Sequence, residues 1–385
     1  MIPYGRQDIT QGDIDAVRDV LVSDFLTQGP QVPRFEASVR EATGVAHAFA
    51  MNSATSALHV ACLALGLGPG DTLWTSPITF VASSNCALYC GASVDFVDID
   101  PVSFNMSPEA LRTKLEAAQV QGKLPKVVVP VHLCGQPCNM EAIGALAQEF
   151  GFKVIEDASH AIGGRYQDEP IGNCRYSDMT IFSFHPVKIV TSAEGGMLLT
   201  NNAELASKVE LFRSHGITRD ASLMVNEPHG PWYYEQVALG YNYRMTELQA
   251  ALGVSQMGRL TQYVRERNEL AKFYDKALES LPLSLPVIAD DAYSAFHLYV
   301  IRLKLDELSR SHREVFEALR AGGVGVNLHY MPVYHQPYYA SMGFDATQFP
   351  HAEAYYGQAI SIPMYPTIGD DKRQRVVDVL KSVLS

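Results

Sequence analysis

Two side chains that could act together in chemistry, Asp157 and Lys188, follow short apolar runs of the sequence. Lys-Val-Ile-Glu precedes Asp157, and Thr-Ile-Phe-Ser-Phe comes shortly before Lys188. Such runs indicate buried strands, and parallel strands bring the residues at their carboxyl ends to one edge of a sheet. A lysine amine can form a Schiff base with pyridoxal phosphate, while a carboxylate keeps the pyridinium nitrogen protonated so that the ring accepts electrons. The pair therefore favours pyridoxal phosphate chemistry; a structural ion pair at a sheet end is the alternative.

A second segment of interest is Asn-Ser-Ala-Thr-Ser-Ala-Leu at 52–58, where small and hydroxylated residues lead into an apolar helical pattern. The first amides of a helix lack partners within it and lie at the positive end of its dipole, so they can hold an anion such as a phosphate. Ala54 and Thr55 are the expected amide donors, and Ser183 could add a hydroxyl. An ordinary Ser/Thr N-cap is the alternative.

Two further residues could contact a flat cofactor. Phe80 comes just after an apolar run at 72–76, where its ring could stack on the cofactor, although a single phenylalanine is more often part of a core. His160 stands three residues after Asp157 and could bond the cofactor's phenolic oxygen or orient Asp157.

The elements that must position these residues alternate between strands and helices. This alternation predicts a mainly parallel sheet with helices on both faces, which binds ligands at the carboxyl ends of its strands. Helices are expected at 13–24 and 33–43, and strands at 46–51, 72–76, 93–97, 126–131, 153–156, 179–184 and 196–200.

The pattern changes after residue 245. Residues 246–280 read as one long amphipathic helix, followed by a proline-containing link, a strand at 296–303 and helices at 311–321 and 370–384. We therefore expect an N-terminal segment and large domain over 1–245, and a connecting helix with a small α/β domain over 246–385.

Composition and charge exclude some partners. The net charge of −12 argues against nucleic acid, because phosphate backbones need a basic surface. No apolar run approaches the length of a membrane span, and the N-terminus does not read as a signal peptide. The chain is therefore expected to be a cytoplasmic protein with no membrane partner.

Six cysteines include two Cys-x3-Cys pairs, Cys86/Cys90 and Cys134/Cys138. A zinc site is one interpretation. Spacing of i, i+4 on a packed helix explains the first pair, and the second lacks the tight Cys-x2-Cys turn of common zinc sites. Buried, reduced thiols and no metal are therefore expected.

Taken together, the motifs resemble those of the DegT/DnrJ/StrS family of pyridoxal phosphate-dependent nucleotide-sugar aminotransferases. They include Asn-Ser-Ala-Thr-Ser-Ala-Leu, Pro-Val-His-Leu-Cys-Gly-Gln-Pro, Glu-Asp-Ala-Ser-His and Phe-Ser-Phe-His-Pro-Val-Lys, in order along nearly the whole chain. The resemblance implies the aspartate aminotransferase-like fold, type I of the pyridoxal phosphate-dependent transferases, with a seven-stranded sheet in the large domain. Cys134 departs from the family, whose members often carry an aromatic residue there.

The resemblance also implies roles for individual residues. Lys188 would be the Schiff-base lysine and proton shuttle, and Asp157 the partner of the pyridinium nitrogen. The phosphate would be held by Ala54, Thr55 and Ser183, and by Asn242 from the neighbouring subunit of a homodimer with shared active sites. Phe80 would stack on the ring. Substrate contacts would come from Tyr4, Asp24, Phe25, Leu26, Thr27, Asn327, Leu328, His329 and Tyr330.

Within the family, His160, Arg-Ser-His-Gly-Ile-Thr-Arg-Asp at 213–220 and Gly-Pro-Trp-Tyr-Tyr-Glu at 230–235 resemble the C4 aminotransferases of pseudaminic acid biosynthesis. The implied reaction moves the amino group of L-glutamate to C4 of UDP-2-acetamido-2,6-dideoxy-β-L-arabino-hexos-4-ulose. The alternatives are an aminotransferase for another nucleotide keto-sugar, at C3 or C4, and a non-catalytic regulator with the same fold. A sugar dehydratase is disfavoured, because those relatives replace the lysine with histidine.

Overall fold

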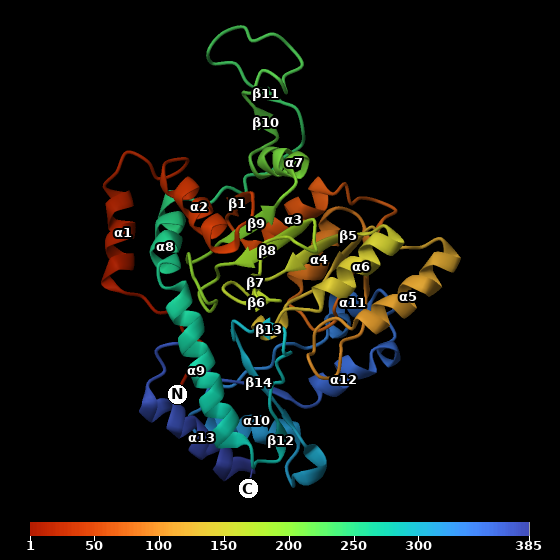
Figure 1. Cartoon of the computed structure of the whole chain (residues 1–385), viewed down its shortest axis with the longest axis vertical. Coiled ribbons are helices and arrows are strands. Elements are labelled where there is room, and N and C mark those ends of the chain that lie inside the picture. Colours follow the sequence, from red (N-terminus) through yellow and green to blue (C-terminus); the bar gives the residue numbers. More distant parts are fainter. Residues whose placement is uncertain (385) are drawn as a thin grey trace.

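The computed structural model describes residues 1–384. Its larger part is built on a seven-stranded sheet (Figure 1). The strands are β1 (His47–Met51), β2 (Thr72–Thr75), β3 (Ser93–Phe96), β4 (Val127–Val129), β5 (Lys153–Asp157), β8 (Met179–Ser183) and β9 (Gly196–Thr200). Their order is β1-β9-β8-β5-β4-β2-β3, parallel from β8 to β3, whereas β9 runs antiparallel to both β8 and β1. The predicted, mainly parallel sheet is confirmed.

Alternate residues of these strands supply two hydrophobic cores, one on each face of the sheet, because successive side chains of a strand point in opposite directions. Val128, Val154 and Phe182 join the core beneath one set of helices, whereas Ile155 and Ile181 join the other. The first set is α2 (Gln31–Thr43), α5 (Pro108–Gln121), α6 (Met140–Phe150) and α8 (Glu247–Met257); the second is α3 (Ala54–Ala64), α4 (Ala82–Tyr89) and α7 (Ala203–Arg213). Helices therefore cover both faces, as predicted.

The C-terminal part contains a smaller antiparallel sheet with its own core. Strands β12 (Leu283–Ser284), β14 (Tyr299–Leu303) and β15 (Ala359–Ile362) pack against α9 (Leu260–Leu278), α10 (His312–Ala321) and α13 (Asp370–Leu384). Tyr339 and Tyr355, from α11 (Pro337–Ala340) and α12 (Pro350–Tyr356), instead join a core of the large sheet. The C-terminal part thus contacts the large sheet extensively, and a domain boundary at 245/246 stays a prediction.

The prediction of one continuous helix over 246–280 is wrong. Helix α8 ends at Met257 and α9 begins at Leu260. Glycine is a poor helix former, and after Gly258 the backbone of Arg259 leaves helical geometry with φ −113° and ψ 5°. The Arg259 guanidinium binds the buried carboxylate of Asp13 in α1 (Gln11–Leu21) at 2.7 Å. This contact with a segment far away in the sequence accompanies the break and could not be read from helical periodicity.

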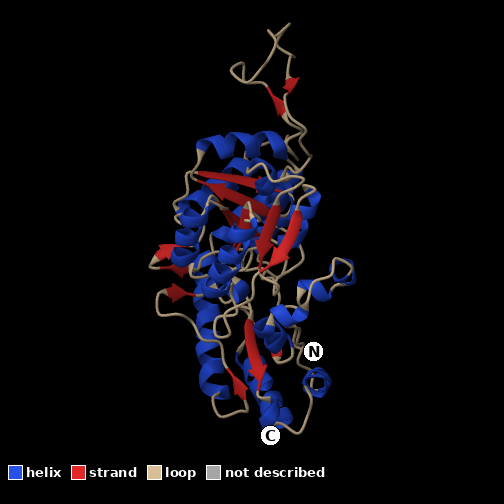
Figure 2. Cartoon of the chain, turned by 90° about the vertical axis from the view of Figure 1, so that its right-hand side faces the viewer, coloured by secondary structure: helices blue, strands red, loops and turns tan. Residues whose placement is uncertain are grey.

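A projecting arm at 214–241 was not predicted. Its short hairpin pairs β10 (Ile217–Thr218) with β11 (Glu235–Gln236), and the arm stands away from the rest of the chain (Figures 1 and 2). The Glu235 carboxylate accepts hydrogen bonds from the Val225 and Asn226 amides and the Tyr233 hydroxyl. These bonds, the Val225 amide first, lower the pKa of Glu235 to about 2. The loop at the end of the arm is therefore organised around a carboxylate.

Another small sheet lies beside the central one. It consists of β6 (Arg165–Tyr166), β7 (Glu169–Pro170) and β13 (Ala292–Tyr293), in the order β13-β6-β7. Because β13 follows α9 in the chain, this sheet is a further link between the two parts of the molecule.

Candidate active site

Asp157 and Lys188 lie at the carboxyl ends of neighbouring strands, as predicted. Asp157 is the last residue of β5, β8 is the next parallel strand, and Lys188 lies in the loop between β8 and β9. Burial disfavours the ammonium and outweighs the attraction of the Asp157 carboxylate, so the pKa of Lys188 falls to about 8. A substantial fraction of neutral amine near neutral pH suits a nucleophile and a base.

The carboxylate of Asp157 is held by two hydrogen bonds. The Ser83 hydroxyl, in the first turn of α4, donates to Oδ2 at 2.6 Å, and the Ser159 amide donates to Oδ1 at 3.1 Å. The two bonds fix the direction of both carboxylate oxygens. Sequence reasoning missed Ser83, because nothing in its local pattern indicates a partner 74 positions away.

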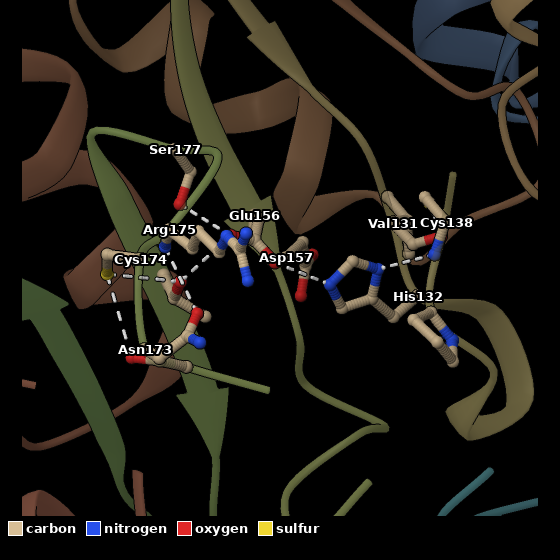
Figure 3. Close-up of polar contacts among 12 residues, drawn as sticks. Val131, His132, Cys138, Glu156, Asp157, Asn173, Cys174, Arg175 and Ser177 are labelled. Atoms are coloured by element: carbon tan, nitrogen blue, oxygen red, sulfur yellow. Dashed lines mark hydrogen bonds and ion pairs between the residues drawn. The ribbon is translucent and has the colours of Figure 1, made fainter. Parts of the chain in front are cut away.

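Glu156, the neighbour of Asp157 in β5, points to the opposite face of the sheet and makes a separate polar network (Figure 3). His132 contacts its carboxylate through Nε2 at 2.8 Å. Because the Cys138 amide donates to Nδ1 at 3.0 Å, the His132 proton must lie on Nε2 and point at Glu156. The His132 amide also donates to the carbonyl of Asp157 at 3.0 Å. This buried pair therefore supports the backbone of Asp157 from behind the site.

The segments predicted to hold a phosphate come together around Gly196. Ser183 faces Gly196 across the β8–β9 pair. A Cβ atom on Gly196 would lie 2.4 Å from the amide nitrogen of Ala54, so only glycine allows this approach. The hydroxyl of the N-cap residue Ser53 accepts from the Ser56 amide. The first-turn amides of Ala54 and Thr55 lack intrahelical partners by geometry and stand available to an anion.

His160 follows Asp157 by three residues in the sequence, and the fold brings it into contact with residues of the C-terminal part. Its Nδ1 accepts from the Cys134 amide at 3.2 Å, and its Nε2 lies 3.2 Å from the Tyr330 hydroxyl. Burial, and then the charge of Lys188, hold the pKa of His160 well below its usual range. His160 is therefore a neutral imidazole that connects the backbone at Cys134 with Tyr330 of the C-terminal part.

Two more histidines stand close to this group. His329, a predicted substrate contact, is buried, and its pKa falls to about 4 because of burial and the charge of Lys188. The ring of His297 lies 4.4 Å from that of His160, and its buried Nδ1 has no partner among residues 1–384. Sequence reasoning missed His297; its position in an apolar run before β14 carries no signal of a site.

Two aromatic residues predicted to contact ligands, Phe80 and Tyr4, lie beside residues of the C-terminal part. Phe80 is 59% exposed, with its ring 6.4 Å from that of Tyr330. An apolar ring so open to solvent has an unused face that a flat group can cover. Tyr4 packs its ring 5.2 Å from that of His329, so two predicted substrate contacts from opposite ends of the chain are neighbours. Asn327 also belongs to this group, through its amide nitrogen 3.3 Å from His329 Nε2.

The remaining predicted contacts lie at the surface. Residues 24–27 form an exposed loop between α1 and α2, where the carbonyl of Leu26 accepts from the amide of Glu247. The Asn242 side chain is exposed at the base of the arm, while its carbonyl accepts from the Asn52 side chain at 3.5 Å. Neither position is joined to Lys188 by a direct hydrogen bond in the part of the chain described, 1–384.

The cysteines differ from the prediction in their burial. All six are free, and Cys62, Cys86, Cys138 and Cys174 are buried, but Cys90 and Cys134 are only partly buried. Cys90 caps the end of α4, and Cys134 has a left-handed backbone with φ 62°. The prediction that all six cysteines are buried is therefore wrong for Cys90 and Cys134, although the sulfur atom of Cys134 is itself desolvated. Burial raises the pKa of the Cys134 thiol to about 12, so it stays protonated beside Lys188.

None of the helices within residues 1–384 has both the length and the apolar composition needed to cross a bilayer.

The fold and this site define an aminotransferase of the aspartate aminotransferase-like class, with a lysine and a carboxylate at the carboxyl ends of adjacent strands. The sequence profile of the DegT/DnrJ/EryC1/StrS aminotransferase family matches residues 7–381, and the chain belongs to this family. It is a sugar aminotransferase, and the expected family and fold are confirmed.

Known relatives are similar over their whole length. The chain is 38% identical over 386 residues to the spore coat polysaccharide biosynthesis protein SpsC of Bacillus subtilis, covering 100% of this chain and 97% of that one. It is also 38% identical over 386 residues to the UDP-4-amino-4,6-dideoxy-N-acetyl-β-L-altrosamine transaminase of Campylobacter jejuni, covering 100% and 98%.

Solved structures agree with this assignment. PseC of Helicobacter pylori, an aminotransferase involved in the biosynthesis of pseudaminic acid, matches with a TM-score of 0.90 and 29% identity, over 100% of this chain and 99% of that one. A putative sugar aminotransferase of Streptococcus pneumoniae in its PLP form matches with a TM-score of 0.88 and 27% identity, over 100% of both chains.

Proposed function

We propose that this chain uses pyridoxal phosphate to transfer the amino group of L-glutamate to C4 of UDP-2-acetamido-2,6-dideoxy-β-L-arabino-hexos-4-ulose, in pseudaminic acid biosynthesis. The observation that carries the proposal is the pairing of Lys188, with its pKa of about 8, and the doubly hydrogen-bonded carboxylate of Asp157. The similarity to the Campylobacter jejuni transaminase and to PseC supports the choice of sugar.

The residues around Lys188 fit the cofactor part by part. The amides of Ala54 and Thr55, kept accessible by Gly196, and the hydroxyl of Ser183 would hold the phosphate. The carboxylate of Asp157 would face the ring nitrogen, and the exposed ring of Phe80 would cover one face of the cofactor. A proposed anion site, a carboxylate, an exposed aromatic ring and an amine together support the cofactor over an accidental ion pair, which does not require the other groups.

When bound, the cofactor supplies an aldehyde that captures amines and a ring that takes up electrons from the neighbouring carbon. Lys188 would hold the cofactor. Once displaced by the amino donor, its amine would take a proton from the α-carbon of the donor and deliver it to the neighbouring carbon of the cofactor. Its low pKa leaves the amine able to accept that proton near neutral pH. Asp157 would keep the ring nitrogen positively charged throughout.

The keto-sugar would lie against the C-terminal part of the site. Tyr4 and His329 are neighbours there, and Tyr4 offers a ring for stacking on uracil. Asn327, Leu328 and Tyr330 extend the same surface. The exposed loop of Asp24, Phe25, Leu26 and Thr27 would complete the substrate site when the protein assembles.

The projecting arm supports a homodimer with shared active sites. A monomer rarely exposes so many large apolar residues on one segment unless they are covered by a partner. Asn242 at the base of this arm would then reach the phosphate in the neighbouring subunit. The exposed apolar residues of the arm are Ile217, Leu223, Val225, Trp232, Tyr234, Val237 and Leu239.

The first test is the visible absorption spectrum of the purified protein before and after adding excess L-glutamate. A yellow band that bleaches with glutamate is expected for the wild type and for Lys153→Ala, an exposed lysine outside the site. Lys188→Ala is expected to lack the wild-type band. A protein that stays colourless after incubation with pyridoxal phosphate contradicts the proposal.

The second test supplies the glutamate-treated protein with a panel of UDP- and dTDP-linked keto-sugars and identifies the amino sugar formed. Amination at C4 of the L-arabino-hexos-4-ulose alone is the expected result. Preference for another keto-sugar would leave the cofactor chemistry intact and assign the chain to a different pathway. The similarity to SpsC is a reason to include several keto-sugars in the panel.

A further inference from the structure

The hydrogen bonds around His160 have a definite direction. A backbone amide can only donate, so the Cys134 amide makes Nδ1 of His160 an acceptor that carries no proton. The single proton of the neutral imidazole must then lie on Nε2, which is 3.2 Å from the Tyr330 hydroxyl oxygen. His160 therefore donates to Tyr330, and the Tyr330 hydroxyl cannot donate to His160.

The hydroxyl hydrogen of Tyr330 is left to point elsewhere. Within residues 1–384 the Tyr330 hydroxyl has no hydrogen-bond partner other than His160. Its ring stands beside the exposed Phe80, at the edge of the space where the cofactor and sugar are proposed to meet. The Tyr330 residue is half-buried, and its hydroxyl, with one accepted bond and one unused hydrogen, can donate to a ligand.

We propose that Tyr330 donates a hydrogen bond to an oxygen atom of the bound ligand, and that the Cys134 amide fixes the direction of this bond through His160. The inference rests on the proposed function and deepens it. Tyr330 is then a residue that touches the ligand, whereas His160 is a positioning residue that acts through Tyr330.

The protonation states of both groups agree with this direction. Burial and the charges of Lys188 and His329 keep the pKa of His160 well below its usual range, so its Nδ1 stays free to accept. Burial raises the pKa of Tyr330, so the hydroxyl keeps its proton at all pH values at which the protein would be assayed. The backbone amide, the imidazole and the hydroxyl thus form a relay with one orientation.

Two ligand oxygens have the right chemistry, a phenolic oxygen on the cofactor and a carbonyl or hydroxyl oxygen on the sugar. His160 itself was expected to bond the cofactor's phenolic oxygen. Its only N–H is instead directed at Tyr330, which moves the donor from the imidazole to the tyrosine. Separate measurements on the cofactor and on the sugar can distinguish the two oxygens.

The first experiment needs no cofactor. In protein labelled with ¹⁵N-histidine, the two ring nitrogens of His160 should show one unprotonated shift for Nδ1 and one N–H shift for Nε2, with the assignment made from the spectrum of His160→Gln. A ring protonated on Nδ1, or on both nitrogens, would overturn the relay.

The second experiment compares Tyr330→Phe with Tyr334→Phe, which removes a buried hydroxyl bonded to Glu353 outside the site. The control should match the wild type. If the ligand oxygen belongs to the cofactor, Tyr330→Phe should change the pH titration of the cofactor band in the absence of substrate. If it belongs to the sugar, that band should stay unchanged and the keto-sugar half-reaction should slow about tenfold. Tenfold is the effect of losing one hydrogen bond to a charge or to a charge that develops in the reaction. Unchanged values in both measurements overturn the proposal.

His160 is tested by two substitutions. In His160→Gln the amide oxygen can accept from Cys134 and the amide nitrogen can donate to Tyr330, so values within about threefold of wild type are expected. His160→Leu removes the donor and should resemble Tyr330→Phe. If His160→Leu changes the cofactor band while Tyr330→Phe does not, His160 contacts the ligand directly and the proposal is wrong. A wild type that binds no cofactor would refute the proposed function and leave the labelling experiment as the test of the relay.

Discussion

The hydroxyl of Ser83 donates a 2.6 Å hydrogen bond to Oδ2 of Asp157 and joins the first turn of α4 to the end of β5. Both residues are buried. The bond directs one carboxylate oxygen, while the Ser159 amide holds the other, so the orientation of the group proposed to face the cofactor ring is set by the protein before any ligand arrives.

Ser83→Ala is therefore expected to weaken pyridoxal phosphate binding about tenfold, the usual effect of losing a hydrogen bond to a charged group. The dissociation constant is measured by titrating the cofactor-free protein and following absorbance. Ser84→Ala is a matched control, because Ser84 is equally buried but bonds Tyr339 and the carbonyl of Val81. An equal loss in both variants would mean that α4 had simply been destabilised.

Gly196→Ala should weaken cofactor binding more strongly, by about a hundredfold. Its Cβ atom would lie 2.4 Å from the Ala54 amide nitrogen, so the backbone of the proposed phosphate site must shift. Competition with inorganic phosphate, measured in the same titration, should be lost as well. Gly68→Ala has open space around its Cβ and is the control. Unchanged binding in Gly196→Ala would place the phosphate elsewhere.

Lys188→Met should stabilise the cofactor-free protein at pH 7, on the order of 1 to 3 kcal/mol, while abolishing transamination. The pKa of Lys188 falls from 10.5 in the unfolded chain to about 8 in the fold, so the unfolded state binds more protons between these values. Wild-type stability should therefore rise with pH from about 8 to 10.5, and the advantage of the methionine variant should shrink over that window.

The measurement is chemical denaturation of both proteins, free of cofactor, at pH 7, 9 and 10. Lys153→Met, at an exposed position, controls for the loss of a lysine as such. A methionine variant that is less stable than the wild type at pH 7 would show that the ammonium of Lys188 is favourably paired in the folded protein.

Hybrid dimers test whether active sites are shared. If Asn242 serves the site of the other subunit, a Lys188→Ala subunit paired with an Asn242→Ala subunit contains one complete site, and up to about half of the wild-type activity should return. Each variant alone should be inactive or nearly so. Lys188→Ala paired with Asp157→Ala is the control, because those two residues belong to the same site in one chain and cannot complement each other.

Absence of rescue would place Asn242 in the site of its own subunit. That outcome has a structural basis, because its carbonyl lies beside Asn52, two residues before the amide of Ala54. The experiment therefore decides between two explicit geometries.

The central sheet, the positions of its seven strands and the ends of β5 and β8 were predictable from the sequence. Apolar runs of strand length separated by helical patterns admit few arrangements, and the carboxyl ends of parallel strands are where such sheets bind ligands. Asp157, Ser183 and Lys188 could be selected on that basis, since each belongs to or closely follows one of these strands.

Other features depend on contacts between segments distant in the sequence. The bond from Ser83 to Asp157, the approach of Gly196 to Ala54, the break at Arg259 and the relay from Cys134 through His160 to Tyr330 each join residues whose local patterns carry no information about their partners. Periodicity and motifs report which face of an element is buried. They do not identify the polar group that each buried side chain contacts. That partner comes from a distant segment of the chain, so only the tertiary structure determines it.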